Sequence, residues 1–220
     1  MSARSGEAGH VTRWWWIRHA PVIGDGGRIY GQADLDCDCS DDALFAALSR
    51  LLPEDPLWVV SSLKRASATA QAIRAQRHEP TGRAPIVVPE FREQFLGDWQ
   101  GLPRDAFFAG REQRAASYWF GPADERAPGG ESFSDLCARV EPAIKALTER
   151  HRGQDIVCVA HGGTIRAALR AALEIPAETA LGFAIANCGL TRIDHIALPG
   201  DEGWRVACVN IFPKALNASA

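Results

Sequence analysis

The chain alternates short apolar runs with longer amphipathic segments, and this alternation constrains its fold more than any other feature. Short apolar runs are typical of buried strands, whereas longer segments with apolar residues three and four apart are typical of helices. Strands that alternate with helices favour a mostly parallel sheet with helices on both faces. We therefore expect an α/β fold with three layers, α/β/α, around a mostly parallel central sheet.

The apolar runs and amphipathic segments give expected boundaries for seven strands and four helices. The expected strands are residues 12–17, 57–61, 86–88, 156–160, 181–186, 190–196 and 205–209. The expected helices are residues 41–52, 64–77, 131–151 and 164–173. Ser40 is a plausible N-cap for the first of these helices, because a serine hydroxyl can accept from the first free amides. The three consecutive tryptophans at 14–16 favour a strand buried on both faces.

The 220 residues are enough for one large domain with a sizeable core. Residues 1–11 lack the apolar segment of a secretory signal, so we expect a disordered tail there and a single domain over 12–220. Eight of the 18 aromatic residues fall between 91 and 120. This concentration of aromatic residues predicts either a small separate hydrophobic core under a long insertion or a lid inserted at about 90–128 whose rings line a substrate pocket.

Charge and hydropathy argue against several classes of protein. The formal net charge is −3, which gives no reason to expect nucleic acid or a membrane surface as a partner. No apolar stretch approaches the roughly 20 residues that cross a bilayer. A cytoplasmic protein that acts on a small molecule is therefore expected, and a homodimer is compatible with the sequence.

The six cysteines are expected to be reduced thiols, because disulfides are rare in a chain of this kind without a signal peptide. Cys158 and Cys208 lie in apolar runs and are expected as small core residues. Cys37 and Cys39 form a single C-x-C without a second pair, which is weak evidence for a metal site. No metal and no cofactor are expected.

Polar side chains follow several of the expected strands, at the point where each strand ends. Arg18 and His19 follow the first, Arg65 comes shortly after the second, and His161 follows the strand at 156–160. Glu93 lies in the loop "FREQFLGDWQG" between two phenylalanines. Because ligands bind beyond the carboxyl ends of parallel strands, we expect these side chains to share one site.

This set of side chains suits phosphoryl transfer. Planar guanidinium groups match phosphate oxygens, so Arg18 and Arg65 can clamp a phosphomonoester. An unprotonated His19 can attack phosphorus and become a phosphohistidine. Glu93 can donate a proton to the leaving oxygen, and His161 can stabilise charge on the transferring group. The two glycines that start at Gly162 can expose helix amides to an anion, and no step needs a metal.

The motifs resemble those of the histidine phosphatase superfamily, the phosphoglycerate-mutase-like group. The family's Arg-His-Gly is Arg18-His19-Ala20 here, and its S-x-x-x-R-A-x-x-T-A block runs from Ser61 to Ala70. Its E-x-x-x-G-x-W-x-G loop starts at Glu93, "PGGESF" leads into the long helix, and "AHGGTIR" supplies the second histidine. The resemblance spans about residues 13–195.

The resemblance implies a phosphoglycerate-mutase-like fold and a phosphohistidine mechanism. It implies His19 as nucleophile, Glu93 as proton donor, and Arg18, Arg65 and His161 as holders of the phosphoryl group. It also implies substrate contacts from Gly162, Asp25, Gln32 and Trp99. Two departures concern the first loop: Ala20-Pro21 replaces the usual glycine and acidic residue, and Asp25 falls where many members place an asparagine.

The loop at Glu93 indicates the branch of the family, because it resembles the loop of the phosphatases more than the "ERHYG" of the mutases. Residues 26–36 and the loop "FLGDWQG" resemble α-ribazole phosphatases of cobalamin assembly and broad-specificity phosphatases. The expected protein is thus a metal-independent phosphomonoesterase, with α-ribazole 5′-phosphate as one candidate substrate that an aromatic lid suits. A phosphoglycerate mutase remains an alternative, as does a catalytically weak protein that binds a phosphate ligand.

Overall fold

A computed structural model of the protein describes residues 9–77, 83–111 and 119–213. Most of the predicted tail therefore lies outside the described residues, as does 112–118 of the predicted lid. The first strand begins at His10, so the end of the predicted tail belongs to the sheet. None of the helices within the described ranges is long and apolar enough to span a membrane.

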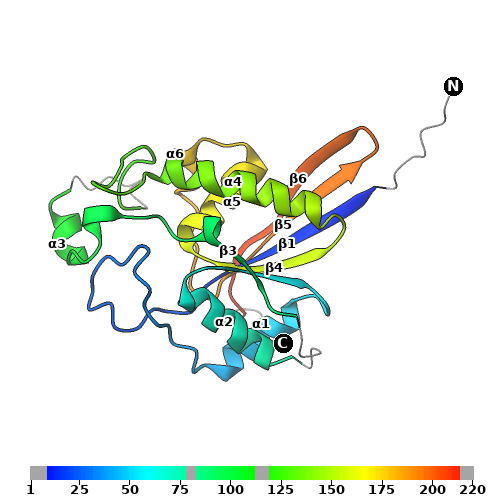
Figure 1. Cartoon of the computed structure of the whole chain (residues 1–220), viewed down its shortest axis with the longest axis horizontal. Helices are drawn as coiled ribbons and strands as arrows, with labels where there is room; N and C mark the ends of the chain where they lie inside the picture. The colour runs from blue at the N-terminus through cyan, green and yellow to red at the C-terminus, as the bar shows by residue number, and fades with distance from the viewer. Residues whose placement is uncertain (1–8, 78–82, 112–118, 214–220) are drawn as a thin grey trace.

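The described strands form one sheet of six in the order β3-β2-β4-β1-β5-β6 (Figure 1). The strands β3, β2, β4 and β1 are parallel to one another. β5 pairs antiparallel with β1, and β6 pairs antiparallel with β5. The prediction of a mostly parallel α/β fold is therefore confirmed. The strands are β1 (His10–Arg18), β2 (Leu57–Ser61), β3 (Ile86–Val88), β4 (Asp155–Ala160), β5 (Leu190–Leu198) and β6 (Asp201–Ile211).

Helices cover both faces of the sheet and complete three layers. Figure 1 shows α1 and α2 below the sheet, and α4, α5 and α6 above it. Each face has its own cluster of buried apolar side chains, which removes apolar surface from water on both sides. The helices are α1 (Asp42–Leu51), α2 (Lys64–Ala75), α3 (Arg104–Ala109), α4 (Phe133–Arg150), α5 (Gly162–Leu173) and α6 (Ala177–Ala180).

The tryptophans of β1 divide between the two faces of the sheet. Trp14 and Trp16 are fully buried on the face that α4 and α5 cover, and their rings stack at 5.0 Å. Trp15 points to the other face, is only half-buried, and lies under the Arg192 guanidinium at 4.6 Å. The prediction of burial on both faces therefore holds only in part at Trp15, which packs against the apolar cluster of that face but stays half-buried beside an arginine.

The predicted strand at 181–186 is wrong. This stretch follows α6 as turns and loop, outside the sheet. Its carbonyl groups bond to arginine side chains instead of a neighbouring strand: Phe183 accepts from Arg166, and Ile185 accepts from Arg18. The apolar run is thus a loop in which Leu181 and Ile185 are buried, a pattern that apolarity alone does not separate from a strand.

The predicted cap of α1 is also wrong by one residue. The N-cap is Asp41, whose carboxylate accepts from the Leu44 amide at 2.9 Å. Ser40 instead donates its hydroxyl to Asp38. Other expected element boundaries agree with the structure within a few residues, and α4 starts with a capping box between Ser132 and Asp135.

Candidate active site

The candidate site lies at the carboxyl ends of three neighbouring strands, β2, β4 and β1. β1 and β4 are parallel, with Arg18 beside Ala160, so the residues that follow each strand lie next to each other. His19 and His161 therefore meet, with ring centroids 5.1 Å apart. Both side chains are buried, at 1% and 0% exposure. The structure thus brings together the two histidines that the sequence placed at strand ends.

The ring of His19 is held in one orientation and stays neutral. Its Nδ1 lies 2.7 Å from the carbonyl oxygen of Ala20, so Nδ1 carries the proton and Nε2 keeps a lone pair. Burial, together with the positive charges of Arg65 and Arg18, lowers the pKa of His19 to about 3, against a smaller opposing effect of the Ala20 hydrogen bond. At neutral pH, His19 therefore presents an unprotonated nitrogen.

The hydroxyl of Ser61 fixes the ring of His161. Its Nε2 lies 2.6 Å from the Ser61 hydroxyl, which also accepts from the Leu63 amide. A serine that accepts from an amide can donate to Nε2, which leaves the proton of the ring on Nδ1. Burial, together with the proximity of His19 and the positive charges of the arginines, holds the pKa of His161 well below its usual range.

Three nitrogen atoms at the site are buried and have no hydrogen-bond partner within the described part of the chain. They are Nδ1 of His161 and the Nε atoms of Arg18 and Arg65. Buried donors are almost always paired in folded proteins, so a group of unpaired ones indicates a ligand. Donors of this kind suit the oxygens of a phosphate.

The two predicted clamp arginines are held by backbone carbonyls. Arg18 donates from Nη1 to the Ile185 oxygen at 2.6 Å, and Arg65 donates to Gly31 and Ala33 at 2.7 Å each. Arg65 is completely buried, and burial lowers its pKa, although Glu93 opposes that shift. These bonds restrict both guanidinium groups before any ligand arrives.

Arg166 is a third buried cation at this site, which the sequence analysis did not assign. Its Nε donates to Phe183 at 2.9 Å, and its guanidinium lies 4.6 Å from the Trp119 ring. Burial lowers the pKa of Arg166 to about 10, so the side chain stays charged at neutral pH. The stretch "AHGGTIR" contains this residue, but only the fold shows that its side chain turns back toward Gly162.

The carboxylate of Glu93 lies against the start of α5. It accepts from the Gly163 amide at 3.1 and 3.3 Å and from the Gln94 amide at 2.9 Å. A Cβ at position 163 would come within 2.3 Å of Oε1 of Glu93, so only glycine allows this approach. The second glycine of "HGG" is therefore explained by its contact with the predicted proton donor.

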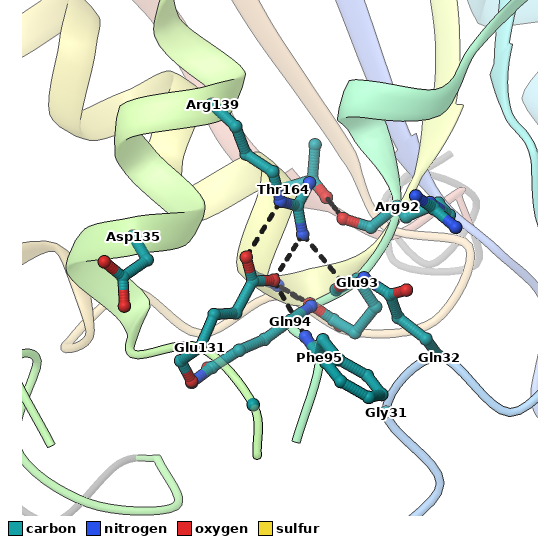
Figure 2. Close-up of polar contacts among 12 residues, drawn as sticks. Gly31, Gln32, Arg92, Glu93, Gln94, Phe95, Glu131, Asp135, Arg139 and Thr164 are labelled. Carbon is teal, nitrogen blue, oxygen red and sulfur yellow. Dashed lines mark hydrogen bonds and ion pairs between the residues drawn. The ribbon is translucent and has the colours of Figure 1, made fainter. Parts of the chain in front are cut away.

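Behind Glu93, an ion pair ties its loop to α4 (Figure 2). Arg139 donates to both carboxylate oxygens of Glu131 at 2.6 and 3.0 Å, and to the carbonyl of Glu93 at 2.9 Å. Glu131 in turn accepts from the Phe95 amide at 2.8 Å, and its own carbonyl accepts from the Gln94 side chain. The loop on either side of Glu93 is therefore held by one half-buried arginine and one glutamate.

A cavity of about 340 Å³ opens over this group of residues. Arg18 and Glu93 lie at its base, and Asn187, whose amide holds the His19 carbonyl at 2.8 Å, lies beside them. Aromatic rings and one further arginine form much of its remaining lining. The lining residues are Arg18, Pro21, Val22, Asp25, Tyr30, Gly31, Glu93, Leu96, Arg104, Trp119, Phe120 and Asn187.

The four predicted substrate contacts have different positions. Asp25 lines the cavity but pairs with Arg104 at 3.3 Å, and Gly162 starts α5 beside Arg18. Gln32 donates its side-chain amide to the Glu93 carbonyl at 2.8 Å. Trp99 is buried in a separate apolar cluster and does not line the cavity, whereas Trp119 does.

The unusual Ala20-Pro21 pair fits the first loop. Ala20 is fully buried, and its φ is not among the positive values in the described ranges, so no glycine is needed there. Its amide donates to the Thr69 hydroxyl at 2.8 Å. In the same ranges, no group of three or more histidine, cysteine, aspartate or glutamate residues is placed to hold a metal ion.

Comparison with known proteins places this site in a family. The model of the histidine phosphatase superfamily (branch 1) matches residues 14–211. Glucosyl-3-phosphoglycerate phosphatase of Mycolicibacterium vanbaalenii is 31% identical, with 94% of this chain and 98% of that protein covered. Metal-independent phosphoserine phosphatase of Arabidopsis thaliana is 34% identical, with 71% and 67% covered.

A solved structure shares the same architecture. The putative α-ribazole-5′-phosphate phosphatase from Escherichia coli superposes with a TM-score of 0.70 and 26% identity, covering 93% of this chain and 97% of that one. The phosphoglycerate-mutase-like fold predicted from the motifs is therefore confirmed.

Proposed function

Because this chain belongs to branch 1 of the histidine phosphatase superfamily and is a phosphomonoesterase acting on small phosphate esters, we propose that it works without a metal through a phosphohistidine at His19. The observation that carries this proposal is the state of the His19 ring. It is buried, neutral and fixed through Nδ1, so that Nε2 faces phosphate-binding groups with a free lone pair. That combination makes imidazole a competent nucleophile.

In the first step, Nε2 of His19 attacks phosphorus, and the bond between phosphorus and the ester oxygen breaks. The leaving oxygen takes a proton from Glu93, which must enter this step as the acid. Arg18, Arg65 and Nδ1 of His161 donate to the phosphoryl oxygens, where negative charge is concentrated. Their preorganisation by carbonyls and by Ser61 reduces the cost of aligning them.

In the second step, water attacks the phosphohistidine. Glu93 is now a carboxylate and accepts a proton from that water, while the bond between phosphorus and nitrogen breaks. Inorganic phosphate leaves, and His19 and Glu93 return to their starting states. The Gly163 amide contacts both carboxylate oxygens, so Glu93 can change between acid and base without moving.

For the substrate class, we favour an ester that carries a second anionic group. Arg104 lines the cavity, pairs with Asp25 at 3.3 Å, and keeps a side chain that is 40% exposed. Glucosyl-3-phosphoglycerate, the compound in the name of the Mycolicibacterium relative, carries a carboxylate close to its phosphate. A guanidinium group at the cavity wall suits such a carboxylate.

α-Ribazole 5′-phosphate is a second candidate, and the aromatic lining favours it. Tyr30, Trp119 and Phe120 can stack on a planar base such as benzimidazole. The structural likeness to a putative α-ribazole-5′-phosphate phosphatase agrees with this candidate. The two candidates differ in what the cavity wall must recognise, a carboxylate or an aromatic ring.

A kinetic screen separates these candidates. Purified enzyme is assayed for phosphate release from glucosyl-3-phosphoglycerate, phosphoglycerates, phosphoserine, α-ribazole 5′-phosphate and phosphosugars, with chelator present. We expect kcat/KM to be highest for an ester with a carboxylate. A maximum at α-ribazole 5′-phosphate would favour the second candidate, and transfer of phosphate between positions of a phosphoglycerate would favour a mutase. Loss of activity with chelator would contradict the metal-independent mechanism.

A further inference from the structure

Two cysteines lie together next to the loop that carries the nucleophile. Cys37 and Cys39 are both half-buried and free, and their sulfur atoms are 3.6 Å apart. Cys37 forms an isolated antiparallel bridge with Val22, and the amide of Asp38 donates to Pro21 at 2.7 Å. The cysteine pair is therefore built onto the backbone that follows His19.

Cys37 also contacts the helix that carries Arg65. Its sulfur lies 3.5 Å from the carbonyl oxygen of Arg65 and 3.7 Å from the hydroxyl oxygen of Thr69. The same hydroxyl accepts from the amide of Ala20, the residue after the nucleophile. One thiol thus touches both a group that positions His19 and the residue that binds phosphate.

We propose that Cys37 and Cys39 form a reversible disulfide under peroxide, and that this modification slows the enzyme by displacing the His19 loop. The change in rate rests on the proposed function of His19, whereas formation of the disulfide does not. The geometry needs only a small movement, since a bonded sulfur pair is about 2.05 Å apart and these atoms must approach by about 1.5 Å.

Burial and the neighbouring Cys37 raise the pKa of Cys39 above its usual range. The thiolate is the form that reacts with peroxide. Either sulfur can react first, because both orders of attack form the same bond between the two sulfur atoms.

The reaction balances with hydrogen peroxide as oxidant. When Cys37 reacts first, its thiolate attacks one peroxide oxygen, the bond between the oxygens breaks, and sulfenic acid and hydroxide form. The Cys39 sulfur then attacks the Cys37 sulfur, and its proton and the leaving hydroxide form water. Two thiols are oxidised by two electrons while peroxide is reduced to water, and a dithiol reductant reverses the change.

The disulfide draws the Cys37 sulfur and the Cys39 sulfur together by about 1.5 Å. The bridge to Val22 and the bond to Pro21 transmit that movement to the residues just after His19. Because a displacement of about 1 Å at a reacting group can slow a reaction by up to about 100-fold, we expect kcat to fall by about tenfold.

The test combines mass spectrometry with activity. Full-length enzyme is treated with hydrogen peroxide, and both the intact mass and the hydrolysis of an aryl phosphate are followed over time. We expect the mass to fall by two hydrogens in parallel with kcat, and dithiothreitol to restore both. Cys37 and Cys39 share one tryptic peptide, residues 29–50, so the disulfide lies within that peptide and makes it two hydrogens lighter.

Matched variants distinguish this pair from the other thiols. We expect C39S to keep its basal activity and to retain most of it under the peroxide exposure that inhibits the wild type. C208S is the control, with unchanged activity and unchanged sensitivity. A crosslink to Cys188, stable sulfinic acid at Cys37, or parallel loss of activity in wild type and C39S would overturn the proposal. A disulfide without any change in rate would overturn the link to the His19 loop alone.

Discussion

The base and the wall of the cavity are built in different ways. The base consists of Arg18 and Glu93, which line the cavity, together with His19, Arg65 and His161, which follow strands or start a helix and are at most 1% exposed. The wall consists of Tyr30, Arg104, Trp119 and Phe120, which come from loops and the short α3 and are partly exposed. Each base residue has fixed partners in the core, whereas the wall consists mainly of rings that contact one another.

This difference separates chemistry from recognition. Groups that must align with a transferring phosphoryl group gain from a rigid setting, and the ends of buried strands provide one. Loop residues can change without disturbing the core, so substrate preference can vary on the same base. Changes in the base should therefore affect every substrate, and changes in the wall should affect substrates selectively.

The largest effect is expected from His19→Ala. This variant removes the nucleophile, so kcat should fall by about 10⁴-fold or more for all phosphate esters. Steady-state phosphate release measures the effect, and circular dichroism checks the fold. His151→Ala, on the half-buried histidine that ends α4, is the matched control and should keep full activity. Substantial turnover in the His19→Ala variant would contradict the role of His19 as nucleophile, and with it the assignment of the chemistry to the base.

A smaller effect is expected from Arg139→Lys, which cannot reproduce the bonds that hold the Glu93 loop. We expect kcat to fall about tenfold for alkyl phosphates, which need a proton donor, and to change little for nitrophenyl phosphate. Glu93→Gln should show the same dependence on the leaving group with a larger fall. Equal losses for both ester types would show that Arg139 acts on stability and not on the proton donor.

A selective effect is expected from Arg104→Ala in the wall. The loss of one charged contact should raise KM about tenfold for an ester with a carboxylate, with kcat for nitrophenyl phosphate unchanged. Trp119→Ala is the comparison, because it should weaken aromatic esters more. Kinetics on both ester types measure the ratio. If Arg104→Ala slowed all substrates alike, the wall would share in the chemistry.

The smallest effect concerns the pH dependence of stability. The native pKa of His19 is about 3, below its ordinary value of 6.5, so only the unfolded chain takes up this proton as the pH falls below 6.5. The free energy of unfolding should therefore fall on acidification, by about 1.4 kcal/mol per pH unit from this group. Urea unfolding at pH 6 and pH 5 should show a smaller decrease for His19→Gln. An unchanged slope would contradict a buried neutral imidazole.

Residues of the candidate site could be predicted where a local sequence pattern fixes the tertiary position. Arg18, His19 and His161 directly follow apolar runs, and the carboxyl ends of parallel strands must meet, so their grouping could be predicted. Their roles, like those of Arg65 and Glu93, stay predictions until the experiments are done. The fold class followed from the same alternation of strands and helices.

Predictions from the sequence were wrong or incomplete where the position of a residue depends on the tertiary structure alone. Trp99 and Trp119 belong to the same aromatic segment, and nothing local shows which ring lines the cavity. Arg166 lies at the candidate site because its side chain turns back toward Gly162. The run at 181–186 is a loop, and the carbonyl groups of Phe183 and Ile185 accept from arginine side chains instead of a neighbouring strand. The contact between Cys37 and Thr69 likewise joins residues 32 positions apart.

The most direct test traps the covalent intermediate. The enzyme is mixed with a ³²P-labelled phosphate ester, quenched in alkali within milliseconds, and digested for peptide mapping. The account predicts acid-labile label on a peptide that contains His19, bonded to nitrogen and absent in His19→Ala. Label on another residue, or a wild-type burst of product with no labelled protein, would contradict it.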